Sequence, residues 1–269
     1  DRYSEKFVRH PNIIKNPSAT ASLFISSIVY GSDGNLWMGT EGNGLQMYNK
    51  KSNQFISYVH RENDPKSLGD NIIKVIVEDS DHNLWIATNS GGLDFFDKKT
   101  KEFSHFTHNV NNSKSLSSDS IWALFRDRQD RLWIGLQHGG LDMFDKERKE
   151  FIHYKSNPSD INSIQPYGIR AITEDDYGNI WIGTENGGLS IFHVQTGVFD
   201  KYVQDDVDNA GINDNSVWSV CKDDKGNMWV GTFSGGINFS NRDANKFNLF
   251  RHDSSALILN NNRVLSILE

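Results

Sequence analysis

One tryptophan recurs every 48 residues along this 269-residue chain, at Trp37, Trp85, Trp133, Trp181 and Trp229. Each lies in a similar phrase, such as RLWIGLQHGGL or NMWVGTFSGGI, and a glycine follows each tryptophan at a constant offset. A constant period of this length indicates one supersecondary unit that is copied along the chain. Most features that stand out in such a sequence therefore do so because the unit repeats them.

The third copy shows what one unit contains. Four short segments rich in apolar residues are expected to be strands, at 120–127, 132–136, 141–145 and 151–155. Turns rich in Asp, Asn and Gly separate them, and no stretch has a sustained 3.6-residue apolar period that would indicate a helix. A parallel β-helix also repeats, but its rungs are shorter and lack four turns each. The sequence therefore predicts an all-β fold, a β-propeller of four-stranded antiparallel blades.

The period divides the chain into five full blades within a single domain, 1–269. The expected blades lie near 25–70, 71–118, 119–166, 167–213 and 214–261. The ends, 1–10 and 262–269, match the fourth and first strands of a repeat and would supply parts of a sixth blade. Either the chain is a piece of a longer propeller, which we favour, or its ends assemble a reduced closing blade. Unpaired strand edges at a gap would also allow a homodimer.

Composition narrows the classes of partner. The chain has 28 basic and 35 acidic residues, a net charge of −7, and no basic block, which disfavours nucleic-acid binding. The apolar runs are far too short to span a bilayer, so this segment is not expected to insert into a membrane. The one cysteine, Cys221, lies in an expected first strand and is interpreted as a structural thiol.

Other motifs are better explained by the repeat than by a ligand. The segment 78–83 has the acidic spacing of a calcium loop, but Leu84 and Ser90 stand where a glycine and a glutamate are needed. The histidines recur at repeat positions, and the glycine-rich segment 39–44 joins two strands instead of leading into a helix. No metal site and no cofactor are therefore expected.

The phrase DNSVWSVCKDDKGNMWVGTFSGGI, followed by KFNLFRHD, resembles the two-component regulator propeller repeat. The resemblance runs from about Glu5 to Glu269, with departures at His82, Ala87 and Leu136. It implies the periplasmic sensor region of a hybrid two-component system, which takes part in signal transduction and transcription regulation. Such sensors in gut Bacteroidetes typically recognise glycan fragments and control polysaccharide utilisation. Further sensor domains, a membrane span, a kinase and a receiver would belong to the same polypeptide, and none of these modules is in this chain.

Two sets of positions are candidates for ligand binding. Alignment on the tryptophan period stacks Ser26, Lys74, Trp122, Arg170 and Trp218 in the first strands, which line the axis of a propeller. Rings can stack on a sugar and cations can meet its acidic groups, so an oligosaccharide is the expected ligand. The alternative is that the indoles simply pack between blades. The second set lies in the variable turns before the glycine pairs: Glu41, Asn43, Asn89, Gln137, His138, Glu185, Asn186 and Phe233.

Three functions are weighed. The first is a non-catalytic sensor propeller whose site comprises Lys74, Trp122, Arg170, Trp218, Gln137, His138, Glu185 and Phe233. The second is a propeller enzyme similar to the streptogramin-inactivating lyases, which use a few histidines and glutamates at the central face. The third is a protein-interaction propeller. No catalytic residue can be singled out, because acids occur at turn positions in every copy.

Overall fold

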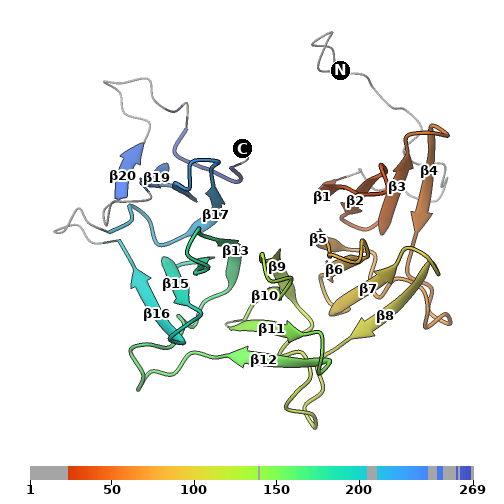
Figure 1. The fold of residues 1–269 in the computed structure, drawn as a ribbon, viewed down its shortest axis with the longest axis horizontal. Helices are drawn as coiled ribbons and strands as arrows, with labels where there is room; N and C mark the ends of the chain where they lie inside the picture. Colours follow the sequence, from red (N-terminus) through yellow and green to blue (C-terminus); the bar gives the residue numbers. More distant parts are fainter. Residues whose placement is uncertain are drawn as a thin grey trace.

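The computed structural model describes residues 24–138, 140–204, 211–241, 247–250, 259 and 261–267. In these residues all regular structure is β-strand, arranged as five four-stranded sheets. Within each sheet, strands that are consecutive in the chain pair antiparallel. Figure 1 shows the sheets as blades in an arc around a common centre, with the first strand of each blade innermost. The predicted propeller architecture is thereby confirmed.

Each blade contributes four strands. Blade 1 comprises β1 (Ile25–Tyr30), β2 (Leu36–Thr40), β3 (Leu45–Asn49) and β4 (Gln54–Tyr58). Blade 2 comprises β5 (Ile73–Glu78), β6 (Leu84–Thr88), β7 (Leu93–Asp97) and β8 (Glu102–Phe106). Blade 3 comprises β9 (Ile121–Arg126), β10 (Leu132–Leu136), β11 (Leu141–Asp145) and β12 (Glu150–Tyr154). Blade 4 comprises β13 (Ile169–Glu174), β14 (Ile180–Thr184), β15 (Leu189–His193) and β16 (Val198–Tyr202). Blade 5 comprises β17 (Val217–Lys222), β18 (Met228–Thr232), β19 (Ile237–Ser240) and β20 (Phe247–Phe250).

A single aspartate organises the turn between the first and second strands. Oδ1 of Asp223 accepts hydrogen bonds from the backbone amides of Lys225 and Asn227, and Oδ2 accepts one from the Trp229 indole at 3.0 Å. Burial opposes ionisation of this carboxyl, but the hydrogen bonds outweigh it and lower the pKa of Asp223 to about 2. Asp79 makes the same turn bonds to the backbone, so the acidic spacing at 78–83 is that of a hairpin turn.

Rings from two consecutive blades hold the first three blade junctions together. At each, the second-strand tryptophan and a fourth-strand ring of one blade meet two phenylalanines of the next. The three clusters are Trp37/Tyr58/Phe96/Phe103, Trp85/Phe106/Phe144/Phe151 and Trp133/Tyr154/Phe192/Phe199. Burial of this much ring surface is a large apolar contribution to stability.

The repeated tryptophans differ in burial because only some of them are covered by a neighbouring blade. Trp37, Trp85, Trp133 and Trp181 are buried, with Trp133 only 1% exposed, whereas Trp229 is half-buried. Trp229 contacts Phe239 and Phe250 of its own blade, and in the described part of the chain no later blade covers it. The predicted placement of all five tryptophans on second strands is confirmed.

Backbone hydrogen bonds link the glycine turns of blades 1, 2, 4 and 5 to the connection that follows each blade. The amide of Gly44 donates to the carbonyl of Asn71, and that of Gly188 to Asn215. The same bond joins Gly236 to Asn262, and Val264 packs at Gly231 as Val217 does at Gly183. The segment 261–267 therefore begins like a first strand. The sequence predicts a strand at 262–268, but residues 261–267 form none, because no second strand lies beside them in the described residues. The matching segment 1–10 lies outside the described residues.

The innermost strand of blade 1 differs from the other first strands. Ile28 and Tyr30 of β1 are 59% and 66% exposed, whereas the corresponding Ile76 of β5 is buried. Figure 1 places the sheets of β1 and β17 at the two ends of the arc. A first strand is thus buried only where a preceding blade packs against it, which the period alone does not show.

Candidate functional site

The five axial positions share one backbone irregularity. In every blade the ladder between first and second strands skips one residue of the first strand, and the skipped residues are Ser26, Lys74, Trp122, Arg170 and Trp218. A β-bulge of this kind re-aims a side chain away from the regular alternation of the strand. The candidate side chains therefore leave the blades at one equivalent point around the axis.

Two of the predicted indoles enclose the guanidinium of Arg170. The Cζ atom of Arg170 lies 3.6 Å from the centre of the Trp122 ring and 5.0 Å from that of Trp218. Its Nη2 donates to Oε1 of Glu185 at 2.9 Å, and its Nε is buried without a hydrogen-bond partner. Blades 3, 4 and 5 thus meet at one cation that stacks between two rings.

A second arginine extends this stack. The Cζ atom of Arg263 lies 4.4 Å from the centre of the Phe233 ring and 5.5 Å from that of Trp218, and the Trp218 and Phe233 ring centres are 4.8 Å apart. Arg263 is absent from the predicted site. It could have been found from the sequence, because NNRV at 261–264 aligns with the residues that lead into each first strand. We call Trp122, Arg170, Trp218, Phe233 and Arg263 the axial stack.

The remaining predicted cation stands apart from the axial stack. Lys74 lies on β5, and its Nζ is 3.5 Å from Oε1 of Glu41. Arg170 and Lys74 therefore each have a carboxylate beside them already, so an acidic ligand would have to replace Glu185 or Glu41. Glu41 and Glu185 are themselves partly exposed, with side-chain exposures of 50% and 35%.

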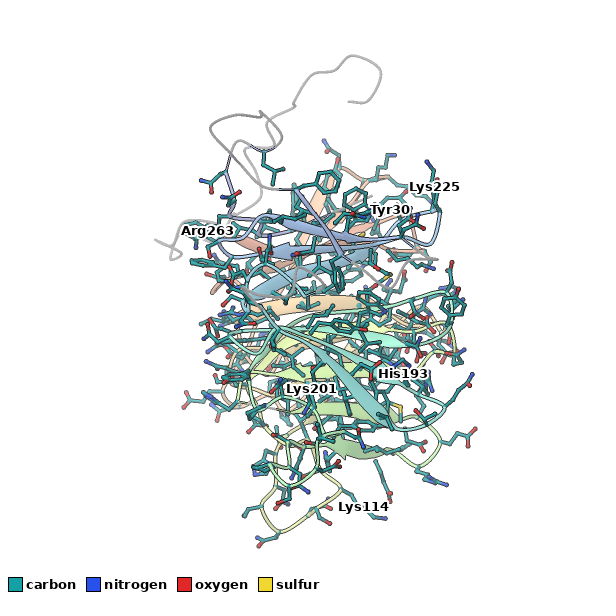
Figure 2. The ribbon with its side chains drawn as sticks, turned by 90° about the vertical axis from the view of Figure 1, so that its left-hand side faces the viewer. Tyr30, Lys114, His193, Lys201, Lys225 and Arg263 are labelled. Atoms are coloured by element: carbon teal, nitrogen blue, oxygen red, sulfur yellow. The ribbon has the colours of Figure 1, made fainter. Side chains whose placement is uncertain are left out.

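The other turn residues occupy the same end of the blades. Gln137 accepts a hydrogen bond from Ser120, Asn43 donates its backbone amide to Thr40, and His138 is exposed. Asn186 accepts from Ser216 of the following connection, and the backbone amide of Asn89 donates to Ile72. In the edge-on view of Figure 2, Arg263 lies on one face and Lys225, in the β17–β18 turn, on the opposite one.

Four histidines connect strands to neighbouring segments through hydrogen bonds. Nδ1 of His105 lies 2.6 Å from the buried carboxylate of Asp94, and its Nε2 lies 3.0 Å from the carbonyl oxygen of Pro65. His153 repeats this arrangement with Asp142 and Ser113, and His60 and His108 bond to carbonyls of the connecting segments. Among the described residues, no three His, Cys, Asp or Glu side chains gather as metal ligands would. The side chain of Cys221 is half-buried, and its thiol donates to the carbonyl oxygen of Lys222 at 3.6 Å.

A family model described as two component regulator propeller matches the chain five times. The matched segments are 21–42, 67–90, 115–138, 163–186 and 211–234. Each match contains the first strand and the tryptophan strand of one blade, so one match falls on each observed blade. No curated protein sequence matches the chain.

Solved structures with the same fold include proteins of different kinds. The extracellular domain of BT4673 from B. thetaiotaomicron, named as a hybrid two component system, is 22% identical with a TM-score of 0.67; the match covers 84% of this chain and 28% of that one. The extracellular domain of BT3049 from the same organism is 22% identical with a TM-score of 0.56; the match covers 93% of this chain and 38% of that one. Virginiamycin B lyase from Staphylococcus aureus is 12% identical with a TM-score of 0.64, over 84% of this chain and 69% of the lyase.

These likenesses show the fold. This chain spans well under half the length of the two extracellular domains that it matches. In the described residues, no helix is long and apolar enough to cross a membrane.

Proposed function

Because the five blades are two component regulator propeller repeats, we propose that the chain is part of the extracytoplasmic, periplasmic sensor region of a hybrid two-component system, and that it binds its ligand without chemical turnover. The full protein would be anchored in the inner membrane and carry kinase and receiver modules. Its ligand would be a glycan fragment that controls polysaccharide utilisation. The family match carries the assignment to a sensor, and the two extracellular domains from B. thetaiotaomicron have the same fold.

The axial stack is our proposed ligand site within this region. Trp122, Trp218 and Phe233 supply ring surface, and Arg170 supplies a charge whose carboxylate partner is partly exposed. An acidic oligosaccharide would displace Glu185 and take over its bond to Arg170. Charge-assisted hydrogen bonds of this kind contribute roughly 1.5–3 kcal/mol.

The likeness to the lyase does not favour a second function. At 12% identity it shows the fold alone. Arg170 of the axial stack pairs with the neighbouring carboxylate of Glu185, and this charge pair suits electrostatic recognition of a ligand. A protein partner, and a homodimer through the open ends of the arc, are compatible with the sensor role but have no specific contact to support them.

The test is a glycan-library screen by calorimetry on this chain and on the complete sensor region, followed by two substitutions of opposite effect. Arg170→Ala should weaken binding of an acidic oligosaccharide about tenfold or more, because the charged contact is lost. Glu185→Gln should strengthen binding, because the internal competitor for Arg170 is neutralised.

Arg128→Ala is the matched control. Arg128 also pairs with a carboxylate, Glu174, but lies in the β9–β10 turn at the other end of the blade. Its replacement should leave affinity unchanged. Equal affinity of Arg170→Ala and the parent chain would place the ligand site elsewhere, and the absence of any glycan ligand for the complete sensor region would overturn the proposed ligand class.

A further inference from the structure

The junction between blades 4 and 5 lacks a ring that the three preceding junctions have. Phe96, Phe144 and Phe192 occupy one register position, opposite Leu84, Leu132 and Ile180 of the neighbouring strand. In blade 5 the residue at this position, opposite Met228, is Ser240. The four-ring cluster is therefore reduced to Trp181, Tyr202 and Phe247.

The remaining rings fill the vacated space only in part. The Trp181 and Phe247 ring centres are 6.2 Å apart, and those of Tyr202 and Phe247 are 5.5 Å apart. Trp181 is 7% exposed against 1% for Trp133, and Phe247 is half-buried, whereas its counterpart Phe199 is buried. At this junction the tryptophan and the fourth-strand phenylalanine are therefore more exposed than their counterparts Trp133 and Phe199.

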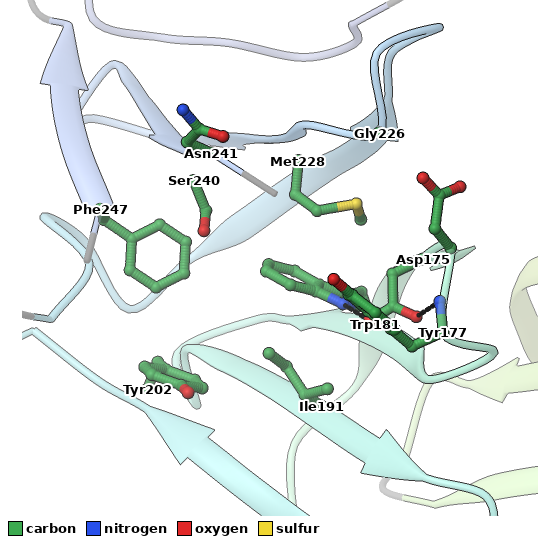
Figure 3. A pocket seen from close by; sticks show the side chains of 11 residues that line it. Asp175, Tyr177, Trp181, Ile191, Tyr202, Gly226, Met228, Ser240, Asn241 and Phe247 are labelled. Atoms are coloured by element: carbon green, nitrogen blue, oxygen red, sulfur yellow. Dashed lines mark hydrogen bonds between the residues drawn. The ribbon is translucent and has the colours of Figure 1, made fainter. Parts of the chain in front are cut away.

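A cavity of about 150 Å³ lies where the ring is missing. Its apolar walls are Trp181, Ile191, Tyr202, Met228 and Phe247, which surround the space next to Ser240 in Figure 3. A closed apolar cavity of roughly 150 Å³ accepts one benzene molecule, so the volume here is sufficient for one ring. This cavity opens partly to solvent, and its walls also carry the polar groups of Asp175, Asp176, Ser240 and Asn241. The three complete junctions show directly that a six-membered ring fits between such neighbours.

The polar groups at this cavity limit the charge of an occupant. Among the residues that the structure describes, the lining contains the carboxylates of Asp175 and Asp176 and no Lys, Arg or His. Asp176 pairs with Lys222 at 2.7 Å, while Asp175 accepts from the Trp181 indole and from Asn179. A benzoate-like anion would meet the carboxylate of Asp175 at close range, so the lining favours a neutral ring.

From these observations we infer that the cavity between blades 4 and 5 is a binding site for a small, neutral, monocyclic aromatic compound. The ring would stand where Phe96, Phe144 and Phe192 stand at the other junctions. The site is separate from the axial stack and does not depend on the proposed sensor function.

Fluorobenzene, monitored by ¹⁹F NMR titration of the full chain, is the probe, with toluene and benzoate as competitors. The parent chain should bind fluorobenzene saturably at one site. Toluene should displace it, and benzoate should compete at least about tenfold more weakly because of the Asp175 carboxylate. No saturable binding, or equal competition by benzoate, would overturn the inference.

Substitutions at Ser240 locate the bound ring. Ser240→Phe restores the ring that the other junctions have, and should weaken fluorobenzene binding about tenfold or more while keeping or raising the melting temperature. Ser240→Ala is the matched control; it leaves the cavity open and should bind like the parent. If Ser240→Phe does not fold, Ser240→Leu fills part of the same space and should still weaken binding. Unchanged binding by the filled variant would show that the ring binds elsewhere.

Discussion

The guanidinium of Arg170 stacks on the indole of Trp122, with its Cζ atom 3.6 Å from the ring centre, although the two residues belong to different blades. Their combined replacement should reveal a favourable coupling. In a double-mutant cycle of Trp122→Ala and Arg170→Ala, measured by urea denaturation, we expect a coupling free energy of about 0.5–2 kcal/mol.

The control cycle pairs Trp122→Ala with Arg128→Ala, since Arg128 lies in the turn at the far end of β9. These two changes should be additive to within about 0.5 kcal/mol. A coupling of the same size in both cycles would mean that the stack between Arg170 and Trp122 contributes nothing specific.

The burial of the repeated tryptophans predicts a gradient in their contribution to stability. Trp133→Ala should lower the free energy of unfolding by about 3–5 kcal/mol, because it empties a fully packed four-ring junction. Trp229→Ala should cost clearly less, because Trp229 is half-buried and its ring contacts among the described residues are with Phe239 and Phe250 of its own blade. Chemical denaturation of both variants measures this difference; equal losses would contradict the unequal packing of the two tryptophans.

The hydrogen bond between Asp94 and His105 makes the free energy of unfolding depend on pH. Both ring nitrogens of His105 face acceptors, a carboxylate and a carbonyl oxygen, which suits the doubly protonated ring. The hydrogen bond to Asp94, against the opposing effect of burial, raises the pKa of His105 above its usual value. Stability from this group is therefore fully present below the unfolded-state pKa of about 6.5 and is lost as pH rises through the raised folded-state pKa.

His105→Gln is the variant that tests this dependence. The difference in unfolding free energy between the parent and His105→Gln should be largest near pH about 5.5 and should shrink toward pH about 9. Denaturant titrations across this range provide the measurement. A difference that is constant with pH would show that protonation of His105 is not linked to folding.

Gly188 and Gly197 have the same backbone conformation but different surroundings. Replacing each by alanine therefore distinguishes the cost of backbone strain from that of a steric collision. Gly188 and Gly197 have φ angles of 78° and 75°, which side chains other than glycine rarely adopt. A Cβ atom at Gly188 would collide with the carbonyl oxygen of Tyr202, whereas one at Gly197 meets no atom within 4 Å. Gly197→Ala should cost about 1 kcal/mol and Gly188→Ala at least about 1 kcal/mol more, as measured by urea denaturation. Similar losses of unfolding free energy in the two variants would mean that the backbone of β16 shifts at Tyr202 to make room for the added Cβ atom.

The repeated features of this molecule could be predicted from the sequence, and the differences between blades mostly could not. The 48-residue period and the turn residues indicate the four-stranded blades and the second-strand position of each tryptophan, because these depend on local patterns. The exposure of Ile28 and Tyr30 depends on what packs against blade 1, which no local pattern encodes.

The candidate site could be predicted only in part for the same reason. The alignment places Trp122, Arg170 and Trp218 together, but not the contact of Arg170 with Glu185, which depends on rotamers and on the bulge. The gap at Ser240 is visible in the sequence, since three phenylalanines occupy the equivalent positions. The sequence does not show that this difference leaves a cavity, because that depends on the contacts that the three phenylalanines make across blade junctions.

The bulge in each first strand allows the residue at the axis to vary without a change in the packing that the blade needs in order to fold. Because the bulged residue lies outside the strand ladder, serine, lysine, arginine and tryptophan all occupy this position in one chain without altering the blade around it. A junction residue such as Phe192 has no such freedom, since its ring is enclosed on all sides. Single substitutions at the bulge can therefore change the chemistry that a propeller of this kind offers along its axis while the scaffold stays the same, so its specificity can diversify quickly on an unchanging frame.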